Sequence, residues 1–443
     1  MAVRLWSASI LGVVLAGAAQ PAAAAPPPVR PGAPISSHAM VHTCCTPAAM
    51  KERIFSESKA MGARFIRVDV ELSGIFASEA GAPDWRRLDE VLELSRRHEL
   101  PALGILLSPP GWLAPHEAQE FGRLAGLVAA HARHTITRWE ILNEPDGAWA
   151  FQGTPEEYAH LLRASYDAIG AAVPEAEVAM GGVMTPEDPG WIERVLATPG
   201  ADAARAFDIA NLHLRGHERG LPGRLAAWRD LLAARGFRGP VWVTEHGYPA
   251  DPAYQTDPAF RGGESAQAAF LTESVLSLAE AGADEVFVTL RDNLDGGFAS
   301  EGVVGIDDQA PHLARRKPAF AAVRRLVDRW GELMSARSEQ RAAEDAAGVE
   351  GEQVAAYRLQ AAGYRAAALA ARAKLTRVRA RYRRARYERA RARLVRDVTR
   401  ATRRLRRRQD QVAWARALAG IHSFRAALHA QHARDLANFV AGG

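Results

Sequence analysis

The stretch ITRWEILNEPD, residues 136–146, begins with seven residues that mix aliphatic and aromatic side chains with polar ones. It ends in the polar turn sequence NEPD. Such a stretch is typical of a strand that stops before Pro145. Similar short runs alternate with longer amphipathic segments from Ile35 to Trp330, which is the pattern of repeated βα units around a parallel sheet. The predicted strands are 38–42, 64–69, 101–107, 136–143, 177–182, 207–213, 240–245 and 284–290.

Eight βα units in succession predict an α/β protein with a closed (β/α)8 TIM barrel. An open doubly wound sheet usually has fewer strands, and no Gly-rich phosphate loop follows the first one. Segment 84–99 illustrates the helices, because its apolar residues repeat near a period of 3.6 while its charged residues face outward. Gly62, Gly170 and Gly282 are expected near helix ends, where glycine favours the C-terminal cap.

Charge divides the chain into an acidic body and a basic tail. The segment from Met334 onward holds 25 Lys+Arg and nine Asp+Glu, whereas residues 1–333 hold 31 and 42. The last proline is Pro318, and the Ala- and Arg-rich sequence beyond it favours long helices. We therefore predict a barrel domain over 36–332 and an all-helical extension over 333–443, a helical hairpin or bundle with coiled-coil-like spacing.

The N-terminus has the pattern of an export signal. A positive start is followed by an apolar run from Ile10 to Ala19 and by small residues at Ala22–Ala25. We expect a signal peptide over 1–25, a Pro-rich linker over 26–35, and a mature protein that is secreted or associated with the cell envelope. The alternative is an uncleaved anchor, for which the apolar run is short.

Two glutamates stand at predicted strand ends. Glu144 ends the fourth strand, and Glu245 lies in VWVTEHGY (241–248), the end of the seventh. In a parallel barrel the loops at these ends form the active-site mouth. Two carboxyl groups about 5–5.5 Å apart suit glycoside hydrolysis with retention of configuration. Each glutamate alone could instead be a solvated strand-end carboxylate.

The Asn-Glu-Pro that follows Trp-Glu-Ile, with Thr-Glu-His-Gly about a hundred residues later, resembles clan A glycoside hydrolases, most closely families 39 and 5. The resemblance covers about residues 36–332. It implies that Glu144 is the acid/base, that Glu245 is the nucleophile, and that Asn143 binds the sugar 2-hydroxyl. The implied function is a retaining O-glycosidase that acts on a polysaccharide or oligosaccharide without a cofactor.

Further site residues follow from strand alternation and from the same resemblance. Alternation places Arg67 inside the barrel with Phe65 and Asp69. The resemblance puts this arginine beside the nucleophile, where it would lower the pKa of the carboxyl group. A buried ion pair with Glu140 is the alternative.

The resemblance also places His213 near the site. Two residues later, where many relatives have a tyrosine that hydrogen-bonds the nucleophile, this chain has Arg215. That contact is then missing or is supplied by Tyr248.

Several residues are candidates for sugar binding. Trp112, Trp149 and Tyr248 fall in predicted βα loops, either as stacking surfaces for sugar rings or as loop anchors. His42 ends the first strand and is a candidate contact to a sugar hydroxyl. Arg291 stands near the position of a platform tryptophan in many relatives, so it either recognises an acidic sugar or pairs with Asp292 or Asp295.

Cys44 and Cys45 are adjacent and are the only cysteines of the sequence. In an exported protein they would tend to oxidise. A vicinal disulfide, two thiols and an intermolecular bridge all remain open. No metal site is expected, because the histidines are scattered and the pair His213 and His217 lacks a convincing set of further ligands.

The basic tail concentrates its charge between Arg372 and Arg408, with 18 Lys+Arg against Glu388 and Asp397. This density favours anionic cell-envelope polymers or lipid headgroups as partners, more than nucleic acid. A solvated appendage is the alternative. For the whole protein, the competing hypotheses are a non-catalytic carbohydrate-binding barrel held at the envelope by its tail, and a transglycosylase.

Overall fold

The structure is a computed structural model that describes residues 25–29, 32–114, 117–184, 189–215, 220–293, 299–307, 310–384 and 388–442. The chain forms two compact units, which meet in sequence between Val323 and Arg324. This division lies inside helix α9 (Pro318–Asp328), slightly before the predicted boundary at 332. The predicted signal peptide lies almost wholly outside the described residues.

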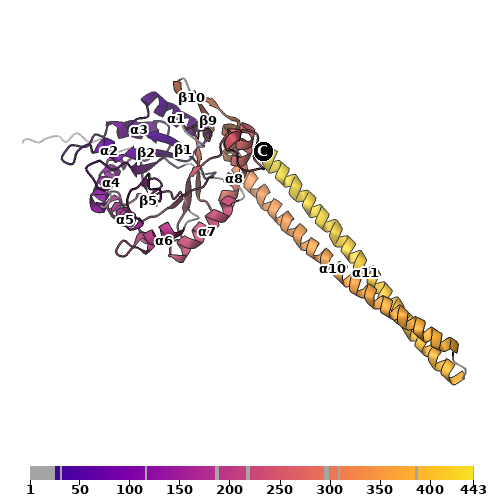
Figure 1. Cartoon of the computed structure of the whole chain (residues 1–443). Helices are drawn as coiled ribbons and strands as arrows, with labels where there is room; N and C mark the ends of the chain where they lie inside the picture. Colours follow the sequence, from indigo (N-terminus) through magenta and orange to yellow (C-terminus); the bar gives the residue numbers. More distant parts are fainter. Residues whose placement is uncertain are drawn as a thin grey trace, which may run out of the picture. The chain divides into compact units, whose positions relative to one another are not determined.

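The first unit contains an eight-stranded parallel sheet in the order β5-β4-β3-β2-β1-β8-β7-β6. Parallel bridges Ala179–Ile209 and Val183–Leu212 join the two ends of this sheet, so that it closes on itself. The (β/α)8 barrel is therefore confirmed (Figure 1). Its strands are β1 (Ile35–His42), β2 (Ile66–Glu71), β3 (Ala102–Leu107), β4 (Arg138–Ile141), β5 (Glu177–Met180), β6 (Ala210–His213), β7 (Val241–His246) and β8 (Glu285–Thr289).

Helices follow the strands, as a right-handed βα succession requires. They are α1 (Ala48–Met61), α2 (Leu72–Ile75), α3 (Arg86–Arg97), α4 (Ala118–Ala132), α5 (Pro155–Ala172), α6 (Pro189–Ala197), α7 (Leu221–Ala234) and α8 (Glu264–Glu280), with the 3-10 turns η1 (Ala203–Arg205) and η3 (Pro252–Tyr254). The helix start at α5 is fixed by a capping box between Thr154 and Glu157.

The predicted helix-ending glycines are only partly confirmed. Gly62 directly follows α1 and Gly282 is the second residue after α8; they take left-handed φ values of 90° and 95°. Gly170 lies near the end of α5 as predicted, but the capping role predicted for it is wrong, because α5 continues through it to Ala172. The sequence analysis also missed an antiparallel pair after β8, formed by β9 (Val304–Asp307) and β10 (Ala310–Arg316).

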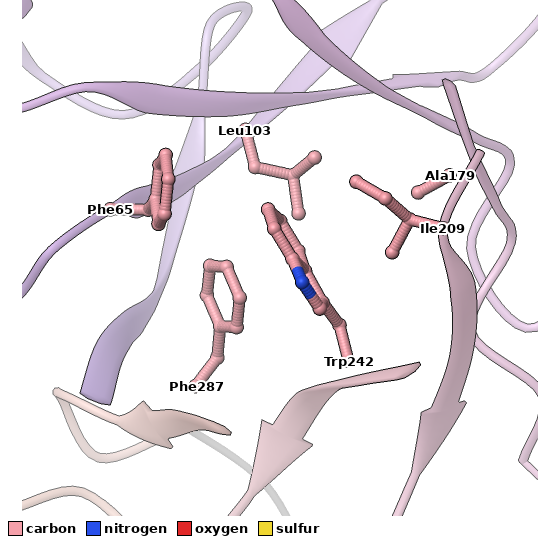
Figure 2. Packing of buried hydrophobic residues seen from close by; sticks show 6 residues of the cluster. All are labelled: Phe65, Leu103, Ala179, Ile209, Trp242 and Phe287. Atoms are coloured by element: carbon pink, nitrogen blue, oxygen red, sulfur yellow. The ribbon is translucent and has the colours of Figure 1, made fainter. Parts of the chain in front are cut away.

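The amino-terminal end of the barrel is filled by buried side chains (Figure 2). Phe65, Trp242 and Phe287 pack with ring centroids 5.3–6.5 Å apart, which suits aromatic packing. The cluster comprises Phe65, Leu103, Ala179, Ile209, Trp242 and Phe287. Val29 packs against it and Ile35 already belongs to β1, so the predicted linker over 26–35 extends too far into the fold.

Beyond the end of α9, the second unit is formed by two helices of 55 residues each, α10 (Trp330–Arg384) and α11 (Glu388–Gly442), packed as a hairpin (Figure 1). This confirms the hairpin among the predicted arrangements. Small and aliphatic residues such as Leu375, Ala401 and Ala415 are buried between the helices. Within the described part of the chain, no helix combines the length and hydrophobicity needed to cross a membrane.

Two glycines give a stability test of this packing. A Cβ added at Gly104 would lie 2.6 Å from the buried indole of Trp139 in the next strand. We expect Gly104→Ala to destabilise the protein by about 1–3 kcal/mol, because the packed ring cannot move aside freely.

Gly170 is the control, since a Cβ there meets no atom within 4 Å. We expect Gly170→Ala to stabilise the protein by roughly 0.5–1 kcal/mol through helix propensity. Denaturant unfolding of both variants measures these changes. Equal unfolding midpoints for the two variants would contradict the packing described for β3 and β4.

Candidate active site

A cavity of about 820 Å³ opens at the carboxyl ends of the barrel strands. This is where a (β/α)8 barrel places its reactive groups. Strand ends β1, β2, β4, β6, β7 and β8 all contribute charged or polar side chains to its wall. These side chains are His38, His42, Arg67, Asp69, Asn143, Glu144, His213, Arg215, Glu245 and Arg291.

Glu144 enters the cavity from the residues that follow β4. The strand ends at Ile141, two residues before its predicted end, because Leu142 and Glu144 have left-handed φ values of 63° and 44°. Side chains other than glycine rarely adopt this backbone region, and such strain is common at functional sites. His213 Nδ1 lies 2.7 Å from Glu144 Oε1 and fixes the carboxyl group.

Glu245 enters from β7 and is almost fully buried. The register of β7 shifts against both of its neighbours near this residue. Such a bulge re-aims side chains relative to simple alternation. Arg67 Nη1 donates to Glu245 Oε1 at 2.6 Å, and Arg215 Nη2 donates to Oε2 at 2.6 Å.

The electrostatic environment keeps Glu245 ionised. Burial alone would raise the pKa of its carboxyl group, but the surrounding histidines and the two guanidiniums outweigh burial and hold the pKa well below its usual range. This group is therefore a carboxylate over the whole neutral and mildly acidic range.

Glu144 and Glu245 face the same small space. His213 Nδ1 is 2.7 Å from Glu144 and 3.7 Å from Glu245, and one oxygen of each carboxyl group lies within 4.8 Å of the other. This separation matches that of two carboxyl groups acting on opposite sides of one glycosidic bond with retention. The structure thus brings together the two glutamates that the sequence singled out.

Arg67 joins the two halves of the site. It is 1% exposed and donates to both oxygens of Glu140, at 2.8 and 2.9 Å, as well as to Glu245. Its Nη2 also donates to Asn143 Oδ1 at 2.7 Å. The two alternatives predicted for Arg67 are therefore both found in one residue, because the guanidinium fork has enough donors for both carboxylates.

Arg215 takes the place expected for Tyr248. Besides Glu245, its guanidinium donates to Glu301, which comes from the loop after β8. Tyr248 is buried away from the cavity, stacks on Phe270 at 4.0 Å and donates to the Phe260 carbonyl. The predictions that Tyr248 touches the nucleophile or a sugar ring are therefore wrong, because its phenol is already packed and hydrogen-bonded.

His38 and Glu301 are site residues that the sequence analysis missed. His38 Nδ1 lies 3.2 Å from Arg67 Nη1, and its Nε2 lies 3.7 Å from Glu245. Burial, opposed by Glu245, holds the pKa of His38 well below its usual range, so its imidazole is neutral at neutral pH. Its alternation with His42 on the first strand was a usable signal. Glu301 lies in a loop, where side-chain periodicity gives no signal of a site residue.

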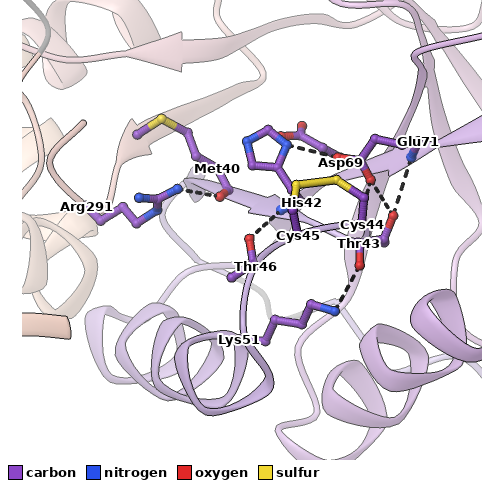
Figure 3. The surroundings of a disulfide bond; sticks show 10 residues. All are labelled: Met40, His42, Thr43, Cys44, Cys45, Thr46, Lys51, Asp69, Glu71 and Arg291. Carbon is purple, nitrogen blue, oxygen red and sulfur yellow. Dashed lines mark hydrogen bonds and ion pairs between the residues drawn. A yellow bond between two sulfur atoms is a disulfide. The ribbon is translucent and has the colours of Figure 1, made fainter. Parts of the chain in front are cut away.

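His42 and Arg291 lie on the β1, β2 and β8 side of the cavity (Figure 3). His42 Nδ1 is 3.0 Å from Glu71 and 3.1 Å from Asp69. The hydrogen bond to Glu71, opposed by burial, raises the pKa of His42, and burial raises the pKa of Asp69 to about 6. These contacts give His42 a fixed orientation at the cavity wall.

Arg291 is held by backbone. Its guanidinium donates to the carbonyls of Ala39 and Met40, where β1 has a register shift. The predicted pairing with Asp292 is wrong, because that carboxylate binds Lys317 at 2.6 Å. The other predicted partner, Asp295, lies outside the described residues.

Cys44 and Cys45 form a vicinal disulfide directly after β1 (Figure 3). This is one of the three redox states that the sequence left open. Both the Cys44 N–H and the Thr43 hydroxyl donate to Glu71 Oε2. The disulfide segment therefore supports Glu71, which in turn orients His42.

The two loop tryptophans have different surroundings. Trp149 is 68% exposed and lines the cavity, as expected for a surface on which a sugar ring stacks. Trp112 donates its indole N–H to the Phe76 carbonyl at 3.0 Å and is not among the lining residues. Trp112 thus acts as a loop anchor, one of its two predicted roles, and does not line the cavity.

Glu144, His213 and Glu245 also place three possible metal ligands within 4.8 Å of one another, which the sequence did not suggest. Two guanidiniums already donate to Glu245 at 2.6 Å. Because a cation at this point would be repelled by both, the geometry favours a site that works through carboxylates alone.

Solved structures of known proteins share the barrel fold of this chain. No protein-family model and no curated protein matches the chain. Among solved structures, a family 39 glycoside hydrolase from Bacteroides cellulosilyticus matches with 15% identity over 65% of this chain and 63% of that one, at a TM-score of 0.50. The chain therefore shares the (β/α)8 barrel fold of this glycoside hydrolase.

Two further structures show the same likeness. A family 39 β-xylosidase from Caulobacter crescentus matches with 17% identity, over 68% of this chain and 72% of that one, at a TM-score of 0.50. A family 5 enzyme from Streptomyces cattleya in complex with GlcNAc matches with 18% identity, over 67% and 81%, at a TM-score of 0.50. The chain spans less than two thirds of the length of the Bacteroides enzyme, and these likenesses concern the barrel.

Arg215 gives a pH test of the site. In Arg215→Gln one of the two guanidiniums on Glu245 is gone and Glu301 remains nearby, so we expect the pKa of Glu245 to rise. A depressed folded pKa stabilises the protein above the unfolded value of about 4.3, and this contribution is lost as the pH falls through the folded value. The variant should therefore lose stability at a higher pH than the wild type.

Carbon-13 NMR titration of the glutamate carboxyl groups, together with unfolding across pH 2 to 7, measures both effects. Arg205→Gln is the control, since Arg205 is exposed and 3.8 Å from Asp202. An unchanged titration of Glu245 in Arg215→Gln would show that this guanidinium does not set the charge of the carboxylate.

Proposed function

We propose that the protein is an exported retaining O-glycosidase that hydrolyses a polysaccharide or oligosaccharide by double displacement. The observation that carries this proposal is the pairing of Glu144 and Glu245 across a small space at the barrel mouth. The barrel fold that the chain shares with glycoside hydrolases supports the proposal, and the two glutamates supply the chemistry that a fold by itself does not determine.

The first displacement requires an ionised nucleophile, and Glu245 fits this role because its pKa is held low. One oxygen of Glu245 attacks the anomeric carbon and forms a glycosyl ester. At the same time Glu144 gives its proton to the glycosidic oxygen, and the bond from that oxygen to the anomeric carbon breaks. The aglycone leaves with the proton.

The second displacement uses the same two groups in exchanged roles. Glu144, now a carboxylate, takes a proton from water, whose oxygen attacks the anomeric carbon and releases Glu245 as a carboxylate. Two inversions give net retention. Arg67 and Arg215 keep the Glu245 oxygens in place for both steps, because each oxygen has its own guanidinium donor.

Export is part of the proposal and is supported by two features. The N-terminal sequence has the composition of a signal peptide. The vicinal disulfide is a bond that oxidising compartments maintain and that the cytosol of most organisms reduces. Edman sequencing of the protein recovered outside the cytoplasm tests whether cleavage occurs near Ala25.

Removing the nucleophile tests the mechanism. We expect Glu245→Gly to lose turnover of an aryl glycoside by a factor of about 10⁴ or more, and azide to restore it. Azide can attack from the vacated side, and with no second displacement the glycosyl azide has inverted configuration. Rate measurements and proton NMR of the product record both results.

Glu144→Ala should also lose activity, most strongly on substrates with poor leaving groups, because these depend on protonation. Glu175→Gln is the control, since this glutamate lies in the exposed turn before β5. Sugar binding without turnover by the wild type would instead support the non-catalytic barrel. Sugar transfer to an added acceptor, in place of hydrolysis, would support a transglycosylase.

Trp149 tests the sugar-binding wall. We expect Trp149→Ala to raise KM for oligosaccharides by about tenfold, the value of one aromatic contact, with little change in stability. Trp112→Ala should instead lower stability, because it removes the hydrogen bond to Phe76. Steady-state kinetics and thermal unfolding separate the two. Equal KM values for Trp149→Ala and the wild type would remove Trp149 from the subsite.

A further inference from the structure

The positive charge of the helical hairpin is confined to one end. Residues 372–408, here called the basic tip, hold 18 Lys+Arg and two acidic residues. The remaining parts of the two helices, 330–371 and 409–442, together hold seven Lys+Arg and eight Asp+Glu. Figure 1 shows that the tip is the end of the hairpin where α10 leads into α11.

Among the described residues, few carboxylates offset the charge of the basic tip. Fifteen of its Lys and Arg side chains are described as exposed. Among the described residues of the tip, the carboxylate paired with them is Asp397, which binds Arg400 at 2.8 Å. Arg377 and Arg381, like Arg403 and Arg407, stand four residues apart on one helix, a spacing at which like charges repel and weaken the helix.

The shape of this charge favours a linear polymer over a lipid surface. Arg377 and Arg379 point about 200° apart around α10, so positive charge lies on opposite sides of the helix. A helix that lies on a membrane instead has an apolar face opposite its basic one. Here the apolar residues Leu375 and Ala401 are buried between the helices, which leaves no such face on the described part of the tip except at Val395.

We propose that the basic tip binds a linear anionic polysaccharide. All but one of its 18 basic residues are arginine. A guanidinium donates two parallel hydrogen bonds to a carboxylate or sulfate group, which an ammonium group cannot do. A polymer that carries such groups at regular intervals fits a rod with guanidiniums along both arms.

The choice of a polysaccharide over a nucleic acid rests on the proposed function. An enzyme that cleaves glycans gains from a second attachment to the same polymer, since attachment raises the local concentration of the bonds it cleaves. The binding itself depends on the charge of the tip and not on Glu144 or Glu245.

The test uses the full chain and two matched variants. The tip variant carries Arg403→Gln, Arg404→Gln, Arg406→Gln, Arg407→Gln and Arg408→Gln. The control variant carries Arg358→Gln, Arg365→Gln, Arg416→Gln, Arg425→Gln and Arg434→Gln, which removes the same charge from exposed positions outside the tip. Circular dichroism checks that both variants keep their helices.

Binding is measured by titration calorimetry with polygalacturonate, dextran, double-stranded DNA and vesicles of phosphatidylcholine with phosphatidylglycerol. We expect the wild type and the control variant to bind polygalacturonate, with an affinity that falls as salt rises. The tip variant should bind it about tenfold or more weakly and with a smaller salt slope. Dextran should not bind.

Three outcomes would overturn the proposal: equal loss in both variants, tighter binding to DNA than to polygalacturonate, or binding to the vesicles alone. A tip variant with Lys in place of Gln should recover less than full affinity, because it restores charge without the guanidinium fork. Hydrolysis of a neutral aryl glycoside should be unchanged in all variants. Absence of that hydrolysis in the wild type would count against the proposed function and not against binding by the tip.

Discussion

The buried guanidinium of Arg67 is the interaction on which the arrangement of the barrel mouth depends. It has carboxylates on two sides, Glu140 and Glu245, and it holds Asn143 as well. A buried charge with no partner costs several kcal/mol, so loss of Arg67 would leave the buried carboxylate of Glu140 without its guanidinium partner. The aromatic cluster below excludes water from one side. Strands β2, β4 and β7 are thereby held in the register that points their carboxylates into one cavity.

This constraint explains why the site tolerates Arg215 where a tyrosine was expected. A phenol would donate one neutral hydrogen bond to Glu245. A second guanidinium adds a full charge, and it is accommodated because Glu301 lies beside it as a counter-ion. The charge of Arg215 at this position therefore requires the carboxylate of Glu301 as its counter-ion. The result is a nucleophile position with one guanidinium donor on each carboxylate oxygen.

The parts that could be predicted from sequence are those set by local periodicity. The eight strands, the helix over 84–99 and the inward direction of Arg67 all follow from side-chain alternation or helical repeat, and all are found. The errors occur where irregular backbone decides. The position of Tyr248 after β7 predicts a place at the site, but its loop turns the ring onto Phe270. Glu301 and the partners of Arg291 depend on loop geometry and on a shift in β1, for which the sequence gives no period.

The charges of the cavity also bear on how a polymer would reach it. Arg67 and Arg215 are matched by Glu140, Glu245 and Glu301 at hydrogen-bond distance, so their fields largely cancel outside the barrel. Attraction over more than about 10 Å in physiological salt needs many unmatched charges of one sign. Residues 372–408 have this property, and the wall of the cavity does not. Selecting a bond to cleave and holding a charged polymer are thus opposing electrostatic demands. One requires charges that are paired and fixed, the other charges that are unpaired and solvated, and this difference is a physical reason for a chain to keep them in separate units.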